Sequence, residues 1–140
     1  MKKITGLCIL YLLISSFSLL RSKKLLETFK IGEYTYKIYD EEGFVNTAKE
    51  QSHFYVLYRE GRSASLCSAY ISTVKDGKTI TKGTYLHTSE YIEFKEHYTG
   101  SKLHADSMMK RYYPDENGGL KLKELTRYRG GDIDKFVYEN

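Results

Sequence analysis

The stretch Phe54-Tyr55-Val56-Leu57-Tyr58-Arg59-Glu60-Gly61 combines an alternating run of apolar side chains with a turn signal. Phe54, Val56 and Tyr58 occupy every second position, and such positions share one face of an extended chain. Glu60-Gly61 ends the run, because glycine accepts backbone conformations that other residues avoid. The stretch therefore predicts a β-strand that leads directly into a reversal of the chain.

The same alternation recurs in residues 34–39 and 92–95. The chain also holds 14 tyrosines and six phenylalanines, and aromatic residues suit the half-buried surface of a sheet. Together these features predict about eight strands joined mainly by short turns. The turn signals are Glu42-Gly43, Glu60-Gly61, Asp76-Gly77, Thr88-Ser89, Thr99-Gly100, Asn117-Gly118-Gly119 and Gly130-Gly131.

A long series of adjacent antiparallel strands must protect its edges from other chains. Closing into a barrel and folding into two layers are the usual solutions. We therefore expect an all-β fold, an antiparallel meander that forms either a barrel or a two-layer sandwich. Residues 23–140 would make up this single domain, since about 120 residues are enough to enclose one core.

Four segments depart from the strand pattern. Residues 44–51 contain good helix formers but are too short for a stable helix, so we expect a helical turn or an irregular crossover there. Residues 103–107 predict a loop, and residues 22–27 a flexible or helical tether. The leucines in residues 120–125 break the two-residue phase, as a β-bulge would.

Residues 64–74 predict a strand in which most side chains are small. Small side chains allow sharp coiling of the strand, or they leave room for a ligand inside the fold. The alternative is that they simply face bulky tyrosines on neighbouring strands, and this second interpretation is favoured.

The N-terminus has the order of residues of a secretory signal peptide. Met1-Lys2-Lys3 precedes an uncharged run, Ile4–Leu20, that ends with several serines. We therefore predict a signal helix in residues 1–22 and an exported protein, periplasmic or secreted. The alternative is an uncleaved inner-membrane anchor through residues 4–20, because 17 apolar residues reach the lower limit of a membrane span and Arg21 follows them.

The formal charge is +4, with 22 basic and 18 acidic residues, and removal of Lys2 and Lys3 would leave about +2. This balance lacks the basic excess of a nucleic-acid-binding domain, so no nucleic-acid partner is expected. Cys8 lies inside the apolar run, too early to be a lipid attachment site. Loss of the signal would leave Cys67 as the one thiol, so no disulfide framework is expected either.

Four parts of the chain share a pattern: residues 54–62, Cys67, Lys82-Gly83-Thr84-Tyr85 and Tyr91-Ile92-Glu93-Phe94. The pattern is a strand ending in a glycine turn, then a Gly-Thr-Tyr strand, and then a hairpin with Ile-x-Phe. In this pattern the chain resembles small exported lipocalin-like bacterial proteins. The resemblance covers about forty residues and implies a barrel-like antiparallel sheet, with no catalytic residue and no defined ligand.

The histidines and the cysteine give no recognisable catalytic or metal site. His53, His87, His97 and His104 occur singly, without the close spacing of zinc ligands, and His97 is in phase with residues expected to face water. Cys67 could be a nucleophile only beside a base, and the sequence places none near it. No metal ligand, cofactor-binding residue or catalytic residue is therefore assigned.

The acidic residues gather at turns, where carboxylates commonly bind backbone amides. Residues 115–119 resemble the start of a calcium loop, but Leu120 stands where that loop needs glycine, so a hairpin turn explains them better. The acidic groups are Asp40-Glu41-Glu42, Asp115-Glu116, and Asp132 with Asp134.

Basic and aromatic residues are interleaved in the last third of the chain. A sheet face of this kind can bind single-stranded nucleic acid or polyanions, and export favours a glycan, a lipid headgroup or a protein over nucleic acid. A solvated face with lysines protecting an edge is the favoured interpretation. The residues are Lys110, Arg111, Lys121, Lys123, Arg127 and Arg129, with Tyr112, Tyr113 and Tyr128 among them.

These observations predict an exported, non-enzymatic β-sheet protein that binds a partner or has a structural role in the cell envelope. The partner would be a protein or an apolar small molecule, and a membrane only if residues 4–20 are retained. One alternative is an inhibitor or immunity-type protein acting on a partner protein. Another is a hydrolase whose site is assembled from distant residues, such as His87 or His104 with turn carboxylates.

Overall fold

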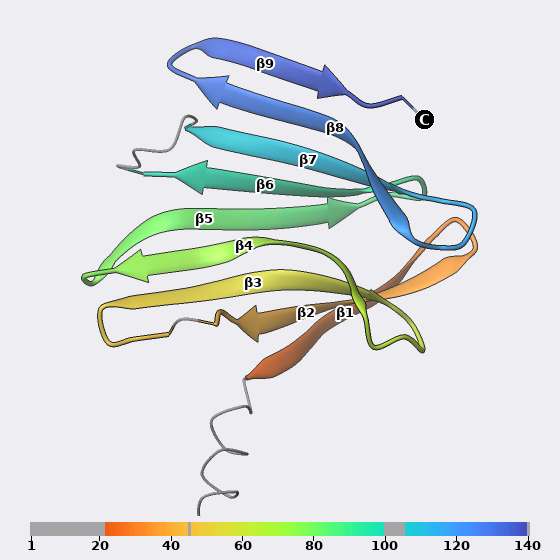
Figure 1. Ribbon diagram of the computed structural model, residues 1–140, viewed down its shortest axis with the longest axis horizontal. Helices are drawn as coiled ribbons and strands as arrows, with labels where there is room; N and C mark the ends of the chain where they lie inside the picture. Colours follow the sequence, from red (N-terminus) through yellow and green to blue (C-terminus); the bar gives the residue numbers. More distant parts are fainter. Residues whose placement is uncertain (1–21, 45, 100–105, 140) are drawn as a thin grey trace, which may run out of the picture.

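The computed structural model describes residues 22–44, 46–99 and 106–139, which form nine β-strands and no helix (Figure 1). These ranges accordingly hold no helix able to cross a membrane. Residues 1–21 of the predicted signal helix, residues 1–22, lie outside them, and Ser22 is described without helical structure. The strands are β1 (Lys23–Ile31), β2 (Tyr34–Glu42), β3 (Glu50–Arg59), β4 (Ser65–Lys75), β5 (Lys78–His87), β6 (Ile92–Tyr98), β7 (Ser107–Pro114), β8 (Leu120–Arg129) and β9 (Asp132–Val137).

Each strand pairs in antiparallel orientation with the next, in the order β1 to β9. The predicted all-β meander is confirmed, with nine strands in place of about eight. The additional strand is β1, whose beginning we had expected to be a tether. A shift in register between Leu25 and Glu27 hides its alternation in the sequence, while its backbone pairs with β2 as far as Lys23 opposite Glu41.

The sheet is open, because β1 and β9 each pair with a single neighbour and not with each other in the described ranges. The expected barrel closure is therefore not found. The sheet instead divides between β4 and β5, which pair only where Ser72–Lys75 meets Lys78–Lys82. Residues 65–71 of β4 pair with β3 alone, and residues 83–87 of β5 pair with β6 alone.

Beyond this division the first strands pack over the later ones and enclose a core of aromatic and aliphatic side chains. Tyr55 contacts Tyr85 and Phe94 across the interior, with ring centroids 5.0 and 6.1 Å apart. The buried members of the core are Phe29, Ile31, Tyr36, Ile38, Leu57, Ala69, Ile92 and Phe94.

Side chains hold the two parts of the sheet together where a barrel would use strand pairing. The Tyr34 hydroxyl donates to the Glu116 carbonyl at 2.8 Å, and the buried Tyr36 hydroxyl donates to the Gly118 carbonyl at 2.9 Å. Arg59 donates to the Asn117 carbonyl in the same turn. Figure 1 shows the β7–β8 hairpin bending toward the β1–β2 hairpin at this end of the molecule.

The predictions for the irregular segments are confirmed in part. Residues 43–49 form an irregular loop without a helical turn in its described residues, and Glu50 already belongs to β3. The predicted bulge is confirmed, since the register of β7 and β8 shifts where Arg111 and Tyr112 face Glu124 and Leu122. Residues 103–105 of the predicted loop and His104 lie outside the described ranges, while Ser107 begins β7.

Candidate functional site

His87 forms an acid–base cluster with two residues that are distant in the sequence. Its Nε2 lies 2.7 Å from Glu27 Oε1, and the Tyr85 hydroxyl donates to Glu27 Oε2 at 2.8 Å. The imidazole also stacks on Phe29, with ring centroids 4.2 Å apart. Glu27 lies on β1 and the other two polar residues on β5, so the cluster fastens the two parts of the sheet.

The hydrogen bond from His87 holds the pKa of Glu27 below its usual value, and the bond from Tyr85 acts in the same direction. A carboxyl group whose pKa is lower in the folded state stabilises the fold above the unfolded pKa of about 4.5. This stabilisation is lost as the pH falls through the folded pKa.

We therefore expect Glu27→Gln to destabilise the protein at pH 6 and to have a smaller effect at pH 3. Urea unfolding midpoints of the two proteins at both pH values measure the difference. The matched control is Glu33→Gln in the exposed β1–β2 turn. An equal Glu27→Gln effect at both pH values would contradict the role assigned to this carboxylate.

The second histidine pair joins neighbouring strands. His53 Nδ1 on β3 lies 2.8 Å from Asp40 Oδ1 on β2. His97 is exposed on β6, as predicted. Within residues 22–44, 46–99 and 106–139, no three histidine, cysteine or acidic side chains form a group able to hold a metal ion.

Cys67 lies on β4 and packs against the core. Burial raises the pKa of its thiol to about 12. Only the thiolate is a nucleophile, so this side chain is almost entirely in its unreactive form at neutral pH. The structure therefore places Cys67 with the packing residues.

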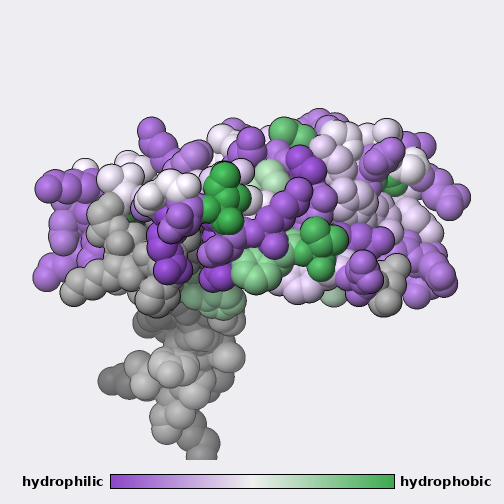
Figure 2. Space-filling view, turned by 90° about the horizontal axis from the view of Figure 1, so that it is seen from above, coloured by the Kyte–Doolittle hydropathy of each residue, from purple (hydrophilic) through white to green (hydrophobic). Residues whose placement is uncertain are grey.

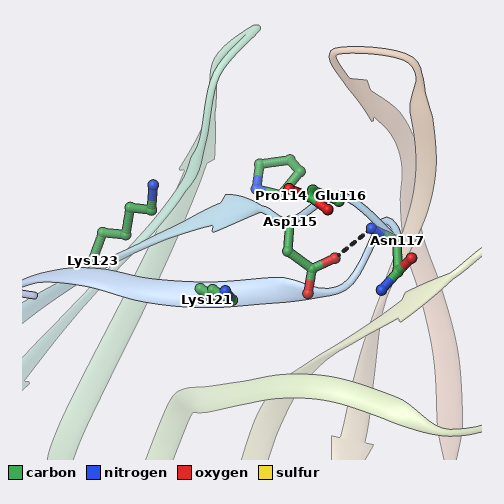
Figure 3. Close-up of a pocket in the computed structure, with 6 residues that line it drawn as sticks. All are labelled: Pro114, Asp115, Glu116, Asn117, Lys121 and Lys123. Atoms are coloured by element: carbon green, nitrogen blue, oxygen red, sulfur yellow. Dashed lines mark hydrogen bonds between the residues drawn. The ribbon is translucent and has the colours of Figure 1, made fainter. Parts of the chain in front are cut away.

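The Asp115 side chain stabilises the acidic turn at residues 115–119. Asp115 Oδ1 accepts hydrogen bonds from the backbone amides of Asn117 and Gly119, at 2.8 and 2.9 Å. Gly118 has a φ of +78°, which supports the hairpin turn predicted from the sequence. Figure 3 shows this turn beside Lys121 and Lys123 of β8, around a polar hollow of about 470 Å³.

The basic and aromatic residues of the last third do not form one surface. Lys110 pairs with the core residue Phe94 and so lies on the inner face of the sheet, whereas its neighbour Arg111 pairs with Glu93 and Glu124. Successive residues of a strand point to opposite faces, which divides the cluster. Arg111 is engaged by both carboxylates, at 2.8 and 3.1 Å, so it is not available as a free cation.

A groove of about 370 Å³ lies on the outer face of β2, β3 and β4. Phe54, Val56 and Tyr58 form its apolar part, and Ser65 and Ser68 provide its small side chains. The Tyr58 hydroxyl donates to Glu41 at 2.7 Å, which places a carboxylate on its rim.

The small residues of β4 therefore have two roles. Cys67 and Ala69 pack against the aromatic core, which is the interpretation favoured from the sequence. Ser65 and Ser68 are exposed on the other face and line the groove. This outer groove was not predicted from the sequence, because it depends on which alternate positions face outward.

The open edge of β4 runs beside this groove. Within the described part of the chain, residues 65–71 have no pairing partner on the side away from β3, and none of these seven residues is charged. The β9 edge is different, because Asp132, Asp134 and Lys135 interrupt its exposed apolar residues. Figure 2 looks onto that edge and shows separate hydrophobic patches within a largely hydrophilic surface. Charged residues on an edge discourage strand addition, and β4 has none in this segment.

No protein-family model, curated protein or solved structure matches this chain. The groove and the β4 edge are therefore interpreted from their geometry and chemistry alone. The lipocalin-like resemblance stays a prediction.

Proposed function

We propose that this protein is an exported, non-enzymatic β-sheet domain that binds an extended segment of a partner protein along residues 65–71 of β4. One observation carries the proposal. This segment of β4 has no charged residue, pairs with β3 alone, and lies beside an apolar groove. Export to the periplasm or the medium, or anchoring through residues 4–20, is inferred from the N-terminal sequence. An inhibitor or immunity-type protein could use the same contact.

Strand addition requires backbone groups that have no partner within the sheet. Every second N–H and C=O of an edge strand points away from its one neighbour, and an extended peptide can pair with these groups. The ladder pairing of β4 with β5 ends at Ser72, and Gly83 of β5 still lies against the Tyr70 carbonyl, so the part of this edge before Tyr70 is the part that lacks a second strand among the described residues. The backbone pairing would supply affinity without requiring a particular partner sequence.

Specificity would come from the groove. Alternate side chains of an added strand point to the same face, so every second residue of the partner could reach Phe54 and Val56. The carboxylates of Glu41 and Glu42 on the rim favour a basic residue at one end of the segment. We therefore expect a partner segment with alternating apolar residues followed by lysine or arginine.

The first test is selection of peptides from a phage-displayed library on the purified protein, followed by binding of the synthetic peptides. We expect slower amide hydrogen exchange in residues 65–71 when a peptide binds. Methylation of every second backbone amide of the peptide should abolish binding, while methylation of the intervening amides should have little effect. Binding that is equally insensitive to methylation at all positions would contradict strand addition.

The second test fills the groove. Ser68→Tyr places a ring beside Phe54, and we expect it to weaken peptide binding about tenfold or more. Thr79→Tyr makes a similar change at an exposed position of β5 and is the matched control. Equal affinities for the two variants would argue against the groove as the binding surface.

A further inference from the structure

A second hollow, of about 280 Å³, lies on the outer face of β1, β2 and β3, on the other side of Tyr58 from the groove. Four cationic residues line it, Lys23, Lys37, Arg59 and Arg62, and the Arg59 guanidinium is already engaged by the Asn117 carbonyl and the Tyr34 ring. Tyr39 and Tyr58 form its aromatic wall, with ring centroids 5.4 Å apart in an edge-on arrangement. This combination of cations and tyrosines differs from the apolar and acidic lining of the groove.

The tyrosines hold Lys23 in place. Its Nζ lies 4.0 Å from the centroid of the Tyr58 ring and 4.5 Å from that of Tyr39. An ammonium group over two aromatic faces is attracted to both rings. Glu41 is the nearby acid, and its carboxylate accepts the hydrogen bond from Tyr58.

Two leucines extend this basic hollow into an amphipathic surface. Leu25 and Leu26 follow Lys23 on β1 and are 46% and 38% exposed. Tyr39 and Tyr58 beside them are half-buried. Leucines and tyrosines next to lysine and arginine are typical of surfaces that rest in the interface between water and a bilayer. Long cationic side chains can reach phosphate groups while their stems cover apolar surface.

The sequence before β1 brings this surface close to a membrane. The uncharged run ends at Leu20, three residues before Lys23. Three residues span about 10 Å at most, roughly one Debye length at physiological salt. While the run is in a bilayer, Lys23 must therefore lie within reach of the headgroups.

We propose that the outer surface formed by Lys23, Leu25, Lys37, Tyr39, Tyr58 and Arg62 docks on the anionic phospholipid headgroups of that membrane. Charge complementarity supplies the attraction, and the leucine inserts between the headgroups. Docking fixes the orientation of the sheet relative to the bilayer. This proposal is independent of peptide binding at β4, because the two hollows share only Tyr58 among the described residues and the ligands differ.

The full chain has no tryptophan, so Leu25→Trp provides a single fluorescent reporter. The protein is reconstituted in phosphatidylcholine vesicles with and without phosphatidylglycerol, each containing a lipid brominated near the headgroup. We expect stronger quenching in the anionic vesicles, and we expect added salt to reduce it. A Tyr128→Trp reporter on β8 should show little quenching in either vesicle. Equal quenching of the Leu25→Trp reporter in both vesicles would overturn the proposal, because tethering alone does not depend on lipid charge.

Charge reversal then tests the residues. Each of Lys37→Glu and Arg62→Glu in the Leu25→Trp protein should weaken docking about fivefold. Lys121→Glu with Lys123→Glu reverses two charges at the hollow in Figure 3 and serves as the control. An equal loss in the control would show a general charge effect and refute a defined docking surface. If a charge-reversed variant fails to fold, the salt dependence of quenching in the Leu25→Trp protein still tests the proposal.

Discussion

Gly83→Ala should lower the free energy of unfolding by about 3 kcal/mol or prevent stable folding. A Cβ at position 83 would lie 1.6 Å from the carbonyl oxygen of Tyr70 and 2.8 Å from its carbonyl carbon. Both atoms belong to the backbone of β4, so no side-chain rotation can relieve the overlap. Only separation of β4 from β5 could do so, at the place where the sheet divides.

The result is measured by urea unfolding, followed by circular dichroism. Gly77→Ala in the β4–β5 turn is the matched control, because a Cβ there meets open space but the backbone has a φ of +74°. Its expected cost is the left-handed strain alone, about 1–2 kcal/mol. If Gly83→Ala unfolded at the same urea concentration as the original protein, the close approach of the two strands would be wrong.

The sequence predicts most of the strands because their side chains alternate locally. β1 was missed because its register shifts at Leu26, which removes the two-residue phase that identifies a strand. The division of the sheet was missed for another reason, since it depends on how far β4 and β5 stay paired. Gly83 inside a strand was the one available signal, because such a glycine often marks close approach of another backbone.

Contacts between side chains across the sheet were harder to predict from the sequence than the strands were. Alternation of Glu93 with Ile92 and Phe94 indicates a face opposite the core, and such a face is normally in water. The structure instead buries Glu93, which is 3% exposed, under Arg111. Likewise Glu27 and His87 are 60 residues apart and meet only after the sheet folds over. Local patterns define the face of a residue but not what covers that face.

The ion pair of Glu93 with Arg111 leads to the second prediction of a large loss of stability. Arg111 Nε binds Glu93 at 2.8 Å, Nη1 binds Glu124 at 3.1 Å, and the guanidinium lies 4.7 Å from the centroid of the Tyr91 ring. The bond to Glu93 is the main cause that raises the pKa of Arg111 above its ordinary value. The guanidinium thus stays charged throughout the accessible pH range.

Arg111→Met should lower the free energy of unfolding by about 2–3 kcal/mol, since it leaves the Glu93 carboxylate buried without its cation. This expected loss is smaller than that for a fully buried ion pair, because the Arg111 side chain is 30% exposed. Glu93→Leu combined with Arg111→Met should recover most of the loss, because two apolar side chains need no charge partner. Lys110→Met is the comparison variant. Its ammonium lies 4.0 Å from Glu96, and this equally buried carboxylate also accepts a hydrogen bond from the Tyr98 hydroxyl at 2.6 Å, so loss of the cation should matter less. Urea unfolding of the original protein, Glu93→Leu, Arg111→Met and the double variant completes a double-mutant cycle. A strictly additive result would mean that Arg111 stabilises the sheet through Glu124 or Tyr91, and that Glu93 tolerates burial without it.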